Sequence, residues 1–257
     1  MNLLPFVVAP LLVFVRVMAF LFALPIFGFG MMPSRMHLVL AAGLTVALSP
    51  PLFATAAHGV MISSSAALLG AIAVELLLGS LIGFVVGLVF AGANMAGTIV
   101  GNEMGFMLAS TIDPETGTST PLMAHLYELV TMLVFLGLNG HYLALRLLAR
   151  SLETVPPGSS AAGVLLSGGG LVALIGLVFE GALRMAAPLF GVLLLITVGL
   201  ALLAKAVPQF NILDIGFPTR ILVGLAGAGI LLPATIKGFM HLCAVIEGGS
   251  TEMVEGW

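Results

Sequence analysis

The chain has 257 residues, of which 60% are hydrophobic and only 7% charged, and its formal net charge is −3. Its mean hydropathy is +1.24. Soluble domains carry roughly a quarter charged residues, so this composition excludes a water-soluble globule and indicates an integral membrane protein or a subunit of a membrane-associated assembly. The Lys and Arg residues are few and scattered, which argues against nucleic acid as a partner. The single cysteine, Cys243, excludes an internal disulfide and a cysteine-rich metal site.

Long apolar runs follow one another along the chain. Their lengths are enough for membrane-type helices, each of which needs roughly 20 residues to span. The first run lacks a basic leader region, so we interpret it as a retained helix and not as a signal peptide. No repeat of short period is visible, and the expected fold class is all-α. We predict helices near residues 3–27, 36–53, 66–105, 121–149, 171–204 and 212–246.

Prolines mark the boundaries of these runs, because a proline removes a helical hydrogen bond. They occur at or near the boundaries as Pro25, Pro33, Pro50, Pro51, Pro114, Pro121, Pro156 and Pro157. Three others lie within or at the start of apolar runs, where we expect kinks, namely Pro188, Pro218 and Pro233. The segment from Val155 to Gly170 is the best internal linker, so we divide the chain into residues 1–160 and 161–257.

The third run carries small residues at four-residue spacing, which places them on one helical face. A face of glycine lets a second helix approach closely where no water drives helices together. We predict a helix-packing face formed by Gly79, Gly83, Gly87, Ala91, Gly97, Gly101 and Gly105.

A polar loop, Ser110 to Pro121, follows the third run and is the most hydrophilic internal segment. The turn-forming residues Asp113, Pro114 and Gly117, together with the acidic Glu115, suit a compact loop. Bulky apolar residues at its entrance usually belong to a core, yet at the mouth of a pore they could equally make a compliant seal. These entrance residues are Met104, Phe106, Met107 and Leu108.

Ionisable residues inside apolar runs are costly and need partners. Glu180 and Arg184 have the i, i+4 spacing of a helical ion pair, although a transport role stays open. Glu75 has no partner nearby in the sequence. Either it is protonated, or it meets a cation on another helix or subunit, and Arg16 is a candidate.

Other polar residues allow two interpretations each. Asn102 and Glu103, just before the polar loop, either line an aqueous conduit or bond to neighbouring backbone. His125 and Glu128 share a helical face, which favours hydrogen-bonded packing because two ligands alone are a weak metal signal. No phosphate-binding loop, nucleophile elbow or metalloprotease motif is present. We therefore expect neither an enzyme nor a cofactor.

The segment from Ala186 to Leu225 resembles the FliR family of flagellar export proteins and, more distantly, the equivalent subunit of virulence type III secretion systems. The resemblance rests on Ala186, Ala187, Pro188, Gly199, Ala204, Pro208, Asn211, Gly216, Phe217, Pro218 and Gly224. Residues of similar order elsewhere are Arg16, Pro25, Gly28, Pro33, Arg35, Pro50, Gly101, Met104, Gly105, Phe106, Asp113 and Pro114, and the segment 138–143 (LNGHYL) resembles the flagellar branch.

This resemblance implies a FliP-like part over residues 1–160 joined to a FliQ-like helix hairpin and tail over residues 161–257, not a conventional independent transmembrane bundle. It implies a closed export gate, the FliPQR complex, in the bacterial inner membrane within the flagellar basal body. The implied partners are FliP-like and FliQ-like subunits, a FlhB-like switch protein, exported flagellar proteins and membrane lipid. A loop at residues 106–121 would help to close the pore.

The apolar run around Pro208, Asn211 and Pro218, with Pro188, Gly216 and Phe217, is interpreted as a structural joint between hairpins or subunits. Two other functions remain alternatives. One is a proton-coupled secondary transporter using Glu75, Glu103 and Glu180, against which no inverted repeat is visible. The other is a purely structural anchor that does not contact the pore.

Overall fold

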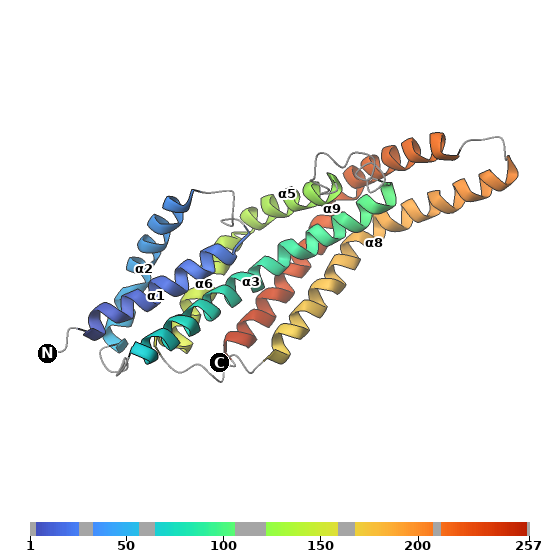
Figure 1. Cartoon of the computed structure of the whole chain (residues 1–257). Coiled ribbons are helices and arrows are strands. Elements are labelled where there is room, and N and C mark those ends of the chain that lie inside the picture. The colour runs from blue at the N-terminus through green and yellow to red at the C-terminus, as the bar shows by residue number, and fades with distance from the viewer. Residues whose placement is uncertain are drawn as a thin grey trace. The chain divides into compact units, whose positions relative to one another are not determined.

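The computed structural model describes residues 4–25, 33–56, 65–105, 122–158, 168–207 and 212–255. Every regular element in these ranges is an α-helix (Figure 1), which confirms the expected helical class for this part of the chain. In chain order the helices are α1 (Leu4–Ala23), α2 (Ser34–Ala56), α3 (Ser65–Met104), α5 (Leu122–Gly137), α6 (Gly140–Thr154), α8 (Gly168–Ala206) and α9 (Ile212–Glu255).

The observed helices differ from the predicted ones in four places. The run predicted at 121–149 is two helices, because Asn139 takes a left-handed conformation with φ 57° between α5 and α6. The proline pair Pro50–Pro51 does not end α2, which continues to Ala56. The C-terminal end of the expected linker, Gly168–Gly170, is already helical, and α9 extends well beyond residue 246.

The internal prolines do not end their helices. Pro188 lies inside α8, and Pro218 and Pro233 lie inside α9, each of which is a single element. A proline inside a helix still leaves the carbonyl four residues earlier without its usual partner.

The chain divides into two contact units, each described by itself. The first comprises residues 1–88, 138–175 and 245–257, and the second comprises residues 89–137 and 176–244. In the first unit α1 contributes to the core Val13, Val17 and Phe20, which are spaced by four and three residues and are at most 1% exposed. In the second, α8 buries Val178, Ala182, Met185, Leu189 and Leu193 at spacings of three or four residues.

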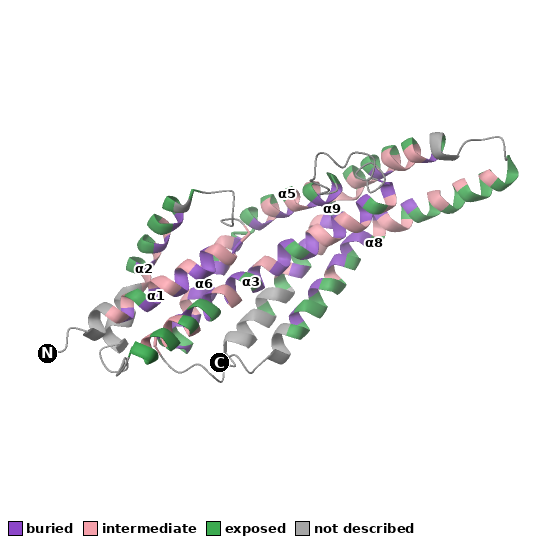
Figure 2. Ribbon diagram, in the orientation of Figure 1, coloured by how far each residue is buried: buried purple, intermediate pink, exposed green. Residues whose placement is uncertain are grey.

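Among the described residues, three helices are long and apolar enough to cross a membrane: Ser65–Met104, Val172–Ala206 and Ile215–Ala244. The bent pair Leu122–Gly137 and Gly140–Thr154 passes the same test if it is taken as one span. The apolar parts of α1 and α2 are shorter, at Val8–Ala23 and Arg35–Leu48. Much of α8 and α9 is exposed or only half-buried (Figure 2).

Candidate functional site

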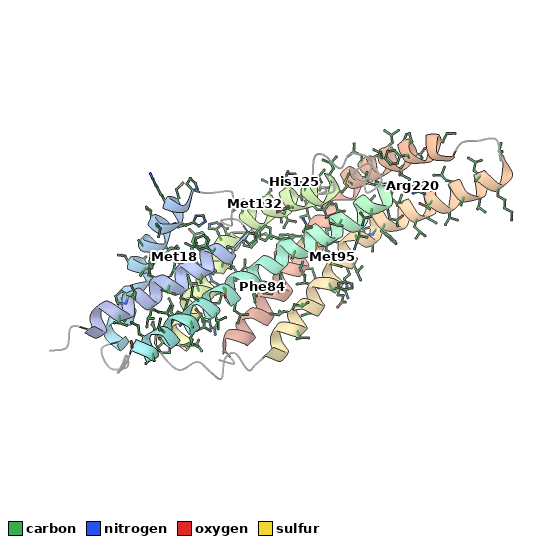
Figure 3. All side chains as sticks on the ribbon, viewed as in Figure 1. Met18, Phe84, Met95, His125, Met132 and Arg220 are labelled. Atoms are coloured by element: carbon green, nitrogen blue, oxygen red, sulfur yellow. The ribbon has the colours of Figure 1, made fainter. Side chains whose placement is uncertain are left out.

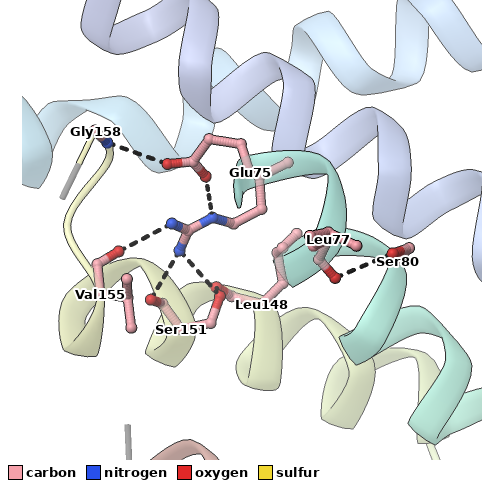
Figure 4. A network of polar contacts seen from close by, with 8 residues as sticks. Glu75, Leu77, Ser80, Leu148, Ser151, Val155 and Gly158 are labelled. Atoms are coloured by element: carbon pink, nitrogen blue, oxygen red, sulfur yellow. Dashed lines mark hydrogen bonds and ion pairs between the residues drawn. The ribbon is translucent and has the colours of Figure 1, made fainter. Parts of the chain in front are cut away.

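The most completely buried charge of the described chain is Arg16 of α1, whose side chain has no exposed surface. Its Nε donates a hydrogen bond to Oε2 of Glu75 on α3, which is also buried (Figure 4). Its Nη1 and Nη2 donate to the backbone carbonyls of Ser151 and Val155, at 2.8 and 3.0 Å. The structure thus pairs Glu75 with the arginine that the sequence suggested.

Arg16 also caps the C-terminal end of α6. The last carbonyls of a helix have no partner within the helix, and positive charge is favourable beside them. Ser151 lies in the last turn of α6, which ends at Thr154, and Val155 follows that end. The Ser151 carbonyl also accepts the backbone N–H of Val155 at 3.0 Å, so the guanidinium adds a second donor there and supplies one to the carbonyl of Val155.

The second oxygen of Glu75 holds the chain just after α6. Its Oε1 accepts the backbone N–H of Gly158 at 3.1 Å. Gly158 follows Pro157 in a turn and has φ +80°, a conformation that glycine adopts without strain. The expected linker therefore begins with an anchored turn. Sequence reasoning missed this anchor, although the Pro-Pro-Gly order of residues 156–158 is itself a turn signal.

The predicted packing face of α3 does bring backbones close together inside the chain. A Cβ built on Gly83 would lie 2.5 Å from the Cβ of Ala23 on α1, within the first unit. One built on Gly79 would overlap the carbonyl of Arg16, whereas Gly87 leaves ordinary contact distances. In the second unit, a Cβ on Gly97 would lie 2.6 Å from the Cα of Ala124 on α5.

The root of the predicted pore loop is the C-terminal end of α3. Met104, the last residue of α3, is fully buried, and Gly105 follows with φ +88°. The N–H of Gly105 bonds to the carbonyl of Asn102 at 3.0 Å, which closes the last turn. The remaining loop residues of the prediction lie outside the described residues, namely Phe106, Met107, Leu108, Asp113, Pro114, Glu115 and Gly117.

This root contacts the beginning of α9, within the second unit. A Cβ on Gly105 would lie 2.9 Å from the ring of Phe217, and one on Gly224 would lie 2.6 Å from the sulfur of Met104. Gly216 is buried beside Phe217, while Pro218 is exposed. The predicted joint residues Pro208 and Asn211 lie outside the described residues.

The predicted ion pair of α8 forms, but on the surface of this chain. Arg184 donates to Glu180 in α8, and their side chains are 64% and 54% exposed. The burial predicted for this pair is therefore not provided by the chain's own helices. His125 lies 3.9 Å from Glu128, also largely exposed. Glu103 is half-buried near the end of α3. Among the described residues, no group of three His, Cys, Asp or Glu side chains is placed to hold a metal ion.

Comparison with known proteins decides the family. The family described as bacterial export proteins, family 1, matches residues 7–245. The chain belongs to this family. It is 33% identical over 234 residues to the flagellar biosynthetic protein FliR of Escherichia coli K12, covering 90% of this chain and 87% of that protein.

More distant relatives extend the comparison. The chain is 28% identical over 220 residues to FliR of Bacillus subtilis 168, covering 83% and 82% of the two chains. It is 28% identical over 151 residues to the surface presentation of antigens protein SpaR of Shigella flexneri, covering 59% of this chain and 58% of that one. Family membership and the long apolar helices together make this chain a membrane-embedded bacterial export protein.

The buried ion pair should be far more sensitive than the exposed one. Glu75→Gln keeps the size of the side chain but leaves the Arg16 charge buried without compensation, which we expect to cost about 3 kcal/mol or more. Glu180→Gln in the exposed pair should cost at most about 1 kcal/mol. Thermal unfolding of the purified chain in detergent measures both, and equal losses would contradict the role given to Arg16 and Glu75.

The α3 face predicts opposite effects for two glycine substitutions in one helix. Gly83→Ala forces a methyl group against Ala23 and should destabilise the chain by about 1–3 kcal/mol. A Cβ on Gly70 would meet nothing within 4 Å, so Gly70→Ala should stabilise it by up to about 1 kcal/mol. The same unfolding measurement tests both, and a neutral Gly83→Ala would show that α1 and α3 do not approach closely.

Proposed function

We propose that this chain is a non-enzymatic subunit of a flagellar type III protein-export channel. The observation that carries the proposal is the family match over residues 7–245, with FliR relatives that align over most of their own length. The names of these relatives concern flagellar biosynthesis, and that of SpaR concerns surface presentation of antigens. A flagellar role is favoured over a virulence role because the FliR matches are longer.

The proposed subunit works within an assembly, the FliPQR gate of the bacterial inner membrane at the flagellar basal body. Large apolar side chains are exposed on several described helices, such as Val39 (74%), Leu133 (72%) and Ile230 (78%). Apolar surface of this extent needs lipid or partner subunits to cover it. We take the partners to be FliP-like and FliQ-like subunits, a FlhB-like switch protein and exported flagellar proteins.

Within this assembly, residues 1–160 would act as the FliP-like part and residues 161–257 as the FliQ-like hairpin with its tail. The loop at residues 106–121 would contribute to closing the channel. Support comes from the two helix ends that flank the loop, since Met104 is buried against α9 and Ala124 of α5 packs on Gly97 of α3. Defined contacts on both sides suit a loop whose position matters.

The arrangement of Glu75 argues against the alternative of a proton-coupled transporter. Both carboxylate oxygens are engaged, one by Arg16 and the other by the N–H of Gly158. A proton carrier has to gain and lose its proton during transport, and protonating Glu75 would leave Arg16 buried and uncompensated.

Assembly gives the first test of the proposal. The tagged chain, expressed with the other export genes of its host, should be purified as one complex with FliP-like and FliQ-like subunits. The intact mass of that complex gives its composition. Recovery of the chain as a stable monomer under the same conditions would contradict the proposal.

Deletion of residues 110–120 tests the pore-closing role. We expect the complex to assemble at normal levels and to leak ions across the membrane, because part of the barrier is gone. Conductance of cells or of reconstituted complexes measures the leak. Deletion of residues 160–166, between α6 and α8, is the control and should not leak. If removing 110–120 leaves conductance at the level of the control, this loop does not close the pore.

A further inference from the structure

The second unit contains an antiparallel hairpin of α8 and α9 that is joined firmly at one end. Leu242 of α9 fills the space over Gly181 of α8, and Met185 of α8 packs over Gly238 of α9. Leu189 of α8 likewise contacts Gly227. Phe239 and Leu242 of α9 are buried here as well. We call this part, residues 178–193 with 227–244, the hairpin base.

Beyond the base, the hairpin has few buried residues. We define the distal arm as residues 194–207, which end α8 and follow it, together with residues 215–226 of α9. Among its described residues only Gly216 and Gly224 are buried (Figure 2). Segments with little buried surface open at low free-energy cost compared with the core. By the contacts within this chain, the arm is therefore the part of this unit that is easiest to displace as a body.

Both buried residues of the arm lie where α9 meets the end of α3. Gly224 receives the side chain of Met104, and Phe217, next to Gly216, lies over Gly105. We call this contact of Met104 and Gly105 with Phe217 and Gly224 the catch. Since the rest of the arm's described surface is exposed or half-buried, the catch is its main attachment away from the base.

The catch has the chemistry of a contact that can separate. It is apolar packing, and no hydrogen bond or ion pair connects the last turn of α3 to α9 among the described residues. Met104 has a flexible side chain that adapts to irregular surfaces. Arg220 (Figure 3) stands between Phe217 and Gly224 in the sequence of α9, and its Nε is buried without a hydrogen-bond partner among the described residues.

From this arrangement we propose that the distal arm is hinged at the hairpin base and that release of the catch is required for export. The inference rests on the proposed export function. Separating α9 from Met104 and Gly105 frees the end of α3 at the residue where the chain leaves the helix towards residues 106–121. Phe217 and Met104 are then positioning residues. They hold the end of α3 in place and do not select the exported protein.

A reversible disulfide across the catch tests the proposal. The double variant Met104→Cys and Gly224→Cys is made in a Cys243→Ser background. A Cβ on Gly224 would lie 2.7 Å from Cγ of Met104, the position that a cysteine sulfur would occupy, so the geometry suits a disulfide. Thiol labelling followed by mass measurement establishes how many chains are bridged.

A matched pair at the hairpin base provides the control. Met185→Cys with Gly238→Cys changes the same two residue types, and the Cβ on Gly238 would lie 3.9 Å from that of Met185. This bridge fixes the base, which the proposal leaves unmoved during export. Both double variants are tested in the complete export apparatus of the host, before and after oxidation and again after reduction.

Oxidation of the catch pair should lower secretion of flagellar proteins about tenfold or more if fewer than roughly a tenth of the chains stay unbridged. Reduction should restore secretion, and the base pair should secrete normally in both states. Normal secretion by the bridged catch, equal loss in both pairs, or failure of the catch pair to bridge would overturn the proposal. If even wild-type chain and partner subunits support no secretion, the proposed function itself fails.

A second variant tests the proposal if the reduced catch pair does not support secretion. Phe217→Ala removes the ring over Gly105 and should increase ion leakage through assembled complexes, because it weakens the catch. Leu189→Ala removes a similar apolar contact from the hairpin base and should not. Equal leakage in the two variants, or none in Phe217→Ala, would overturn the proposal.

Discussion

The burial of one charge, that of Arg16, constrains the whole first unit. A guanidinium without exposure is tolerated only when its donors are matched, and here they reach α3, α6 and the residue after α6. A carboxylate alone would balance the charge of the guanidinium. The carbonyls of Ser151 and Val155 also fix the orientation of the guanidinium plane. Three helices distant in sequence therefore have one relative arrangement that satisfies every partner, which is a source of specificity in a chain with so few polar groups.

The second unit achieves its packing differently. Its helix contacts repeat one device, in which a Met or Leu side chain fills the space over a glycine, as at the pairs Met104–Gly224, Met185–Gly238, Leu189–Gly227 and Leu242–Gly181. In each pair a Cβ on the glycine would lie between 2.6 and 2.8 Å from the partner side chain. Such contacts give close approach without hydrogen bonds, which suits helices that no hydrophobic effect drives together.

Several features of the fold and site could be read from the sequence because they depend on short-range patterns. Four-residue spacing of Gly79 and Gly83 predicted close approach, and the lone Glu75 in an apolar run predicted a cation such as Arg16. The α5–α6 break was missed because the apolar run is continuous in composition, although Asn139–Gly140 is a turn signal. Ser151 and Val155 could not be predicted, since they contribute backbone carbonyls that any residue provides. Pro50 and Pro51 wrongly suggested a helix boundary, because the tendency of proline to end a helix did not decide where α2 ends.

The two packing modes bear on what each part of the chain can do. An ion pair with several directed bonds resists small displacements, because moving one partner leaves a buried charge uncompensated. Apolar side chains over glycine lose contact gradually and leave no unpaired polar group when they separate. A protein that has to stay assembled while a path through it opens needs both kinds of contact in different places. The buried charge lies in the unit with α1 and α6, whereas the contact at the end of α3 is of the separable kind, which is where an opening movement would meet least resistance.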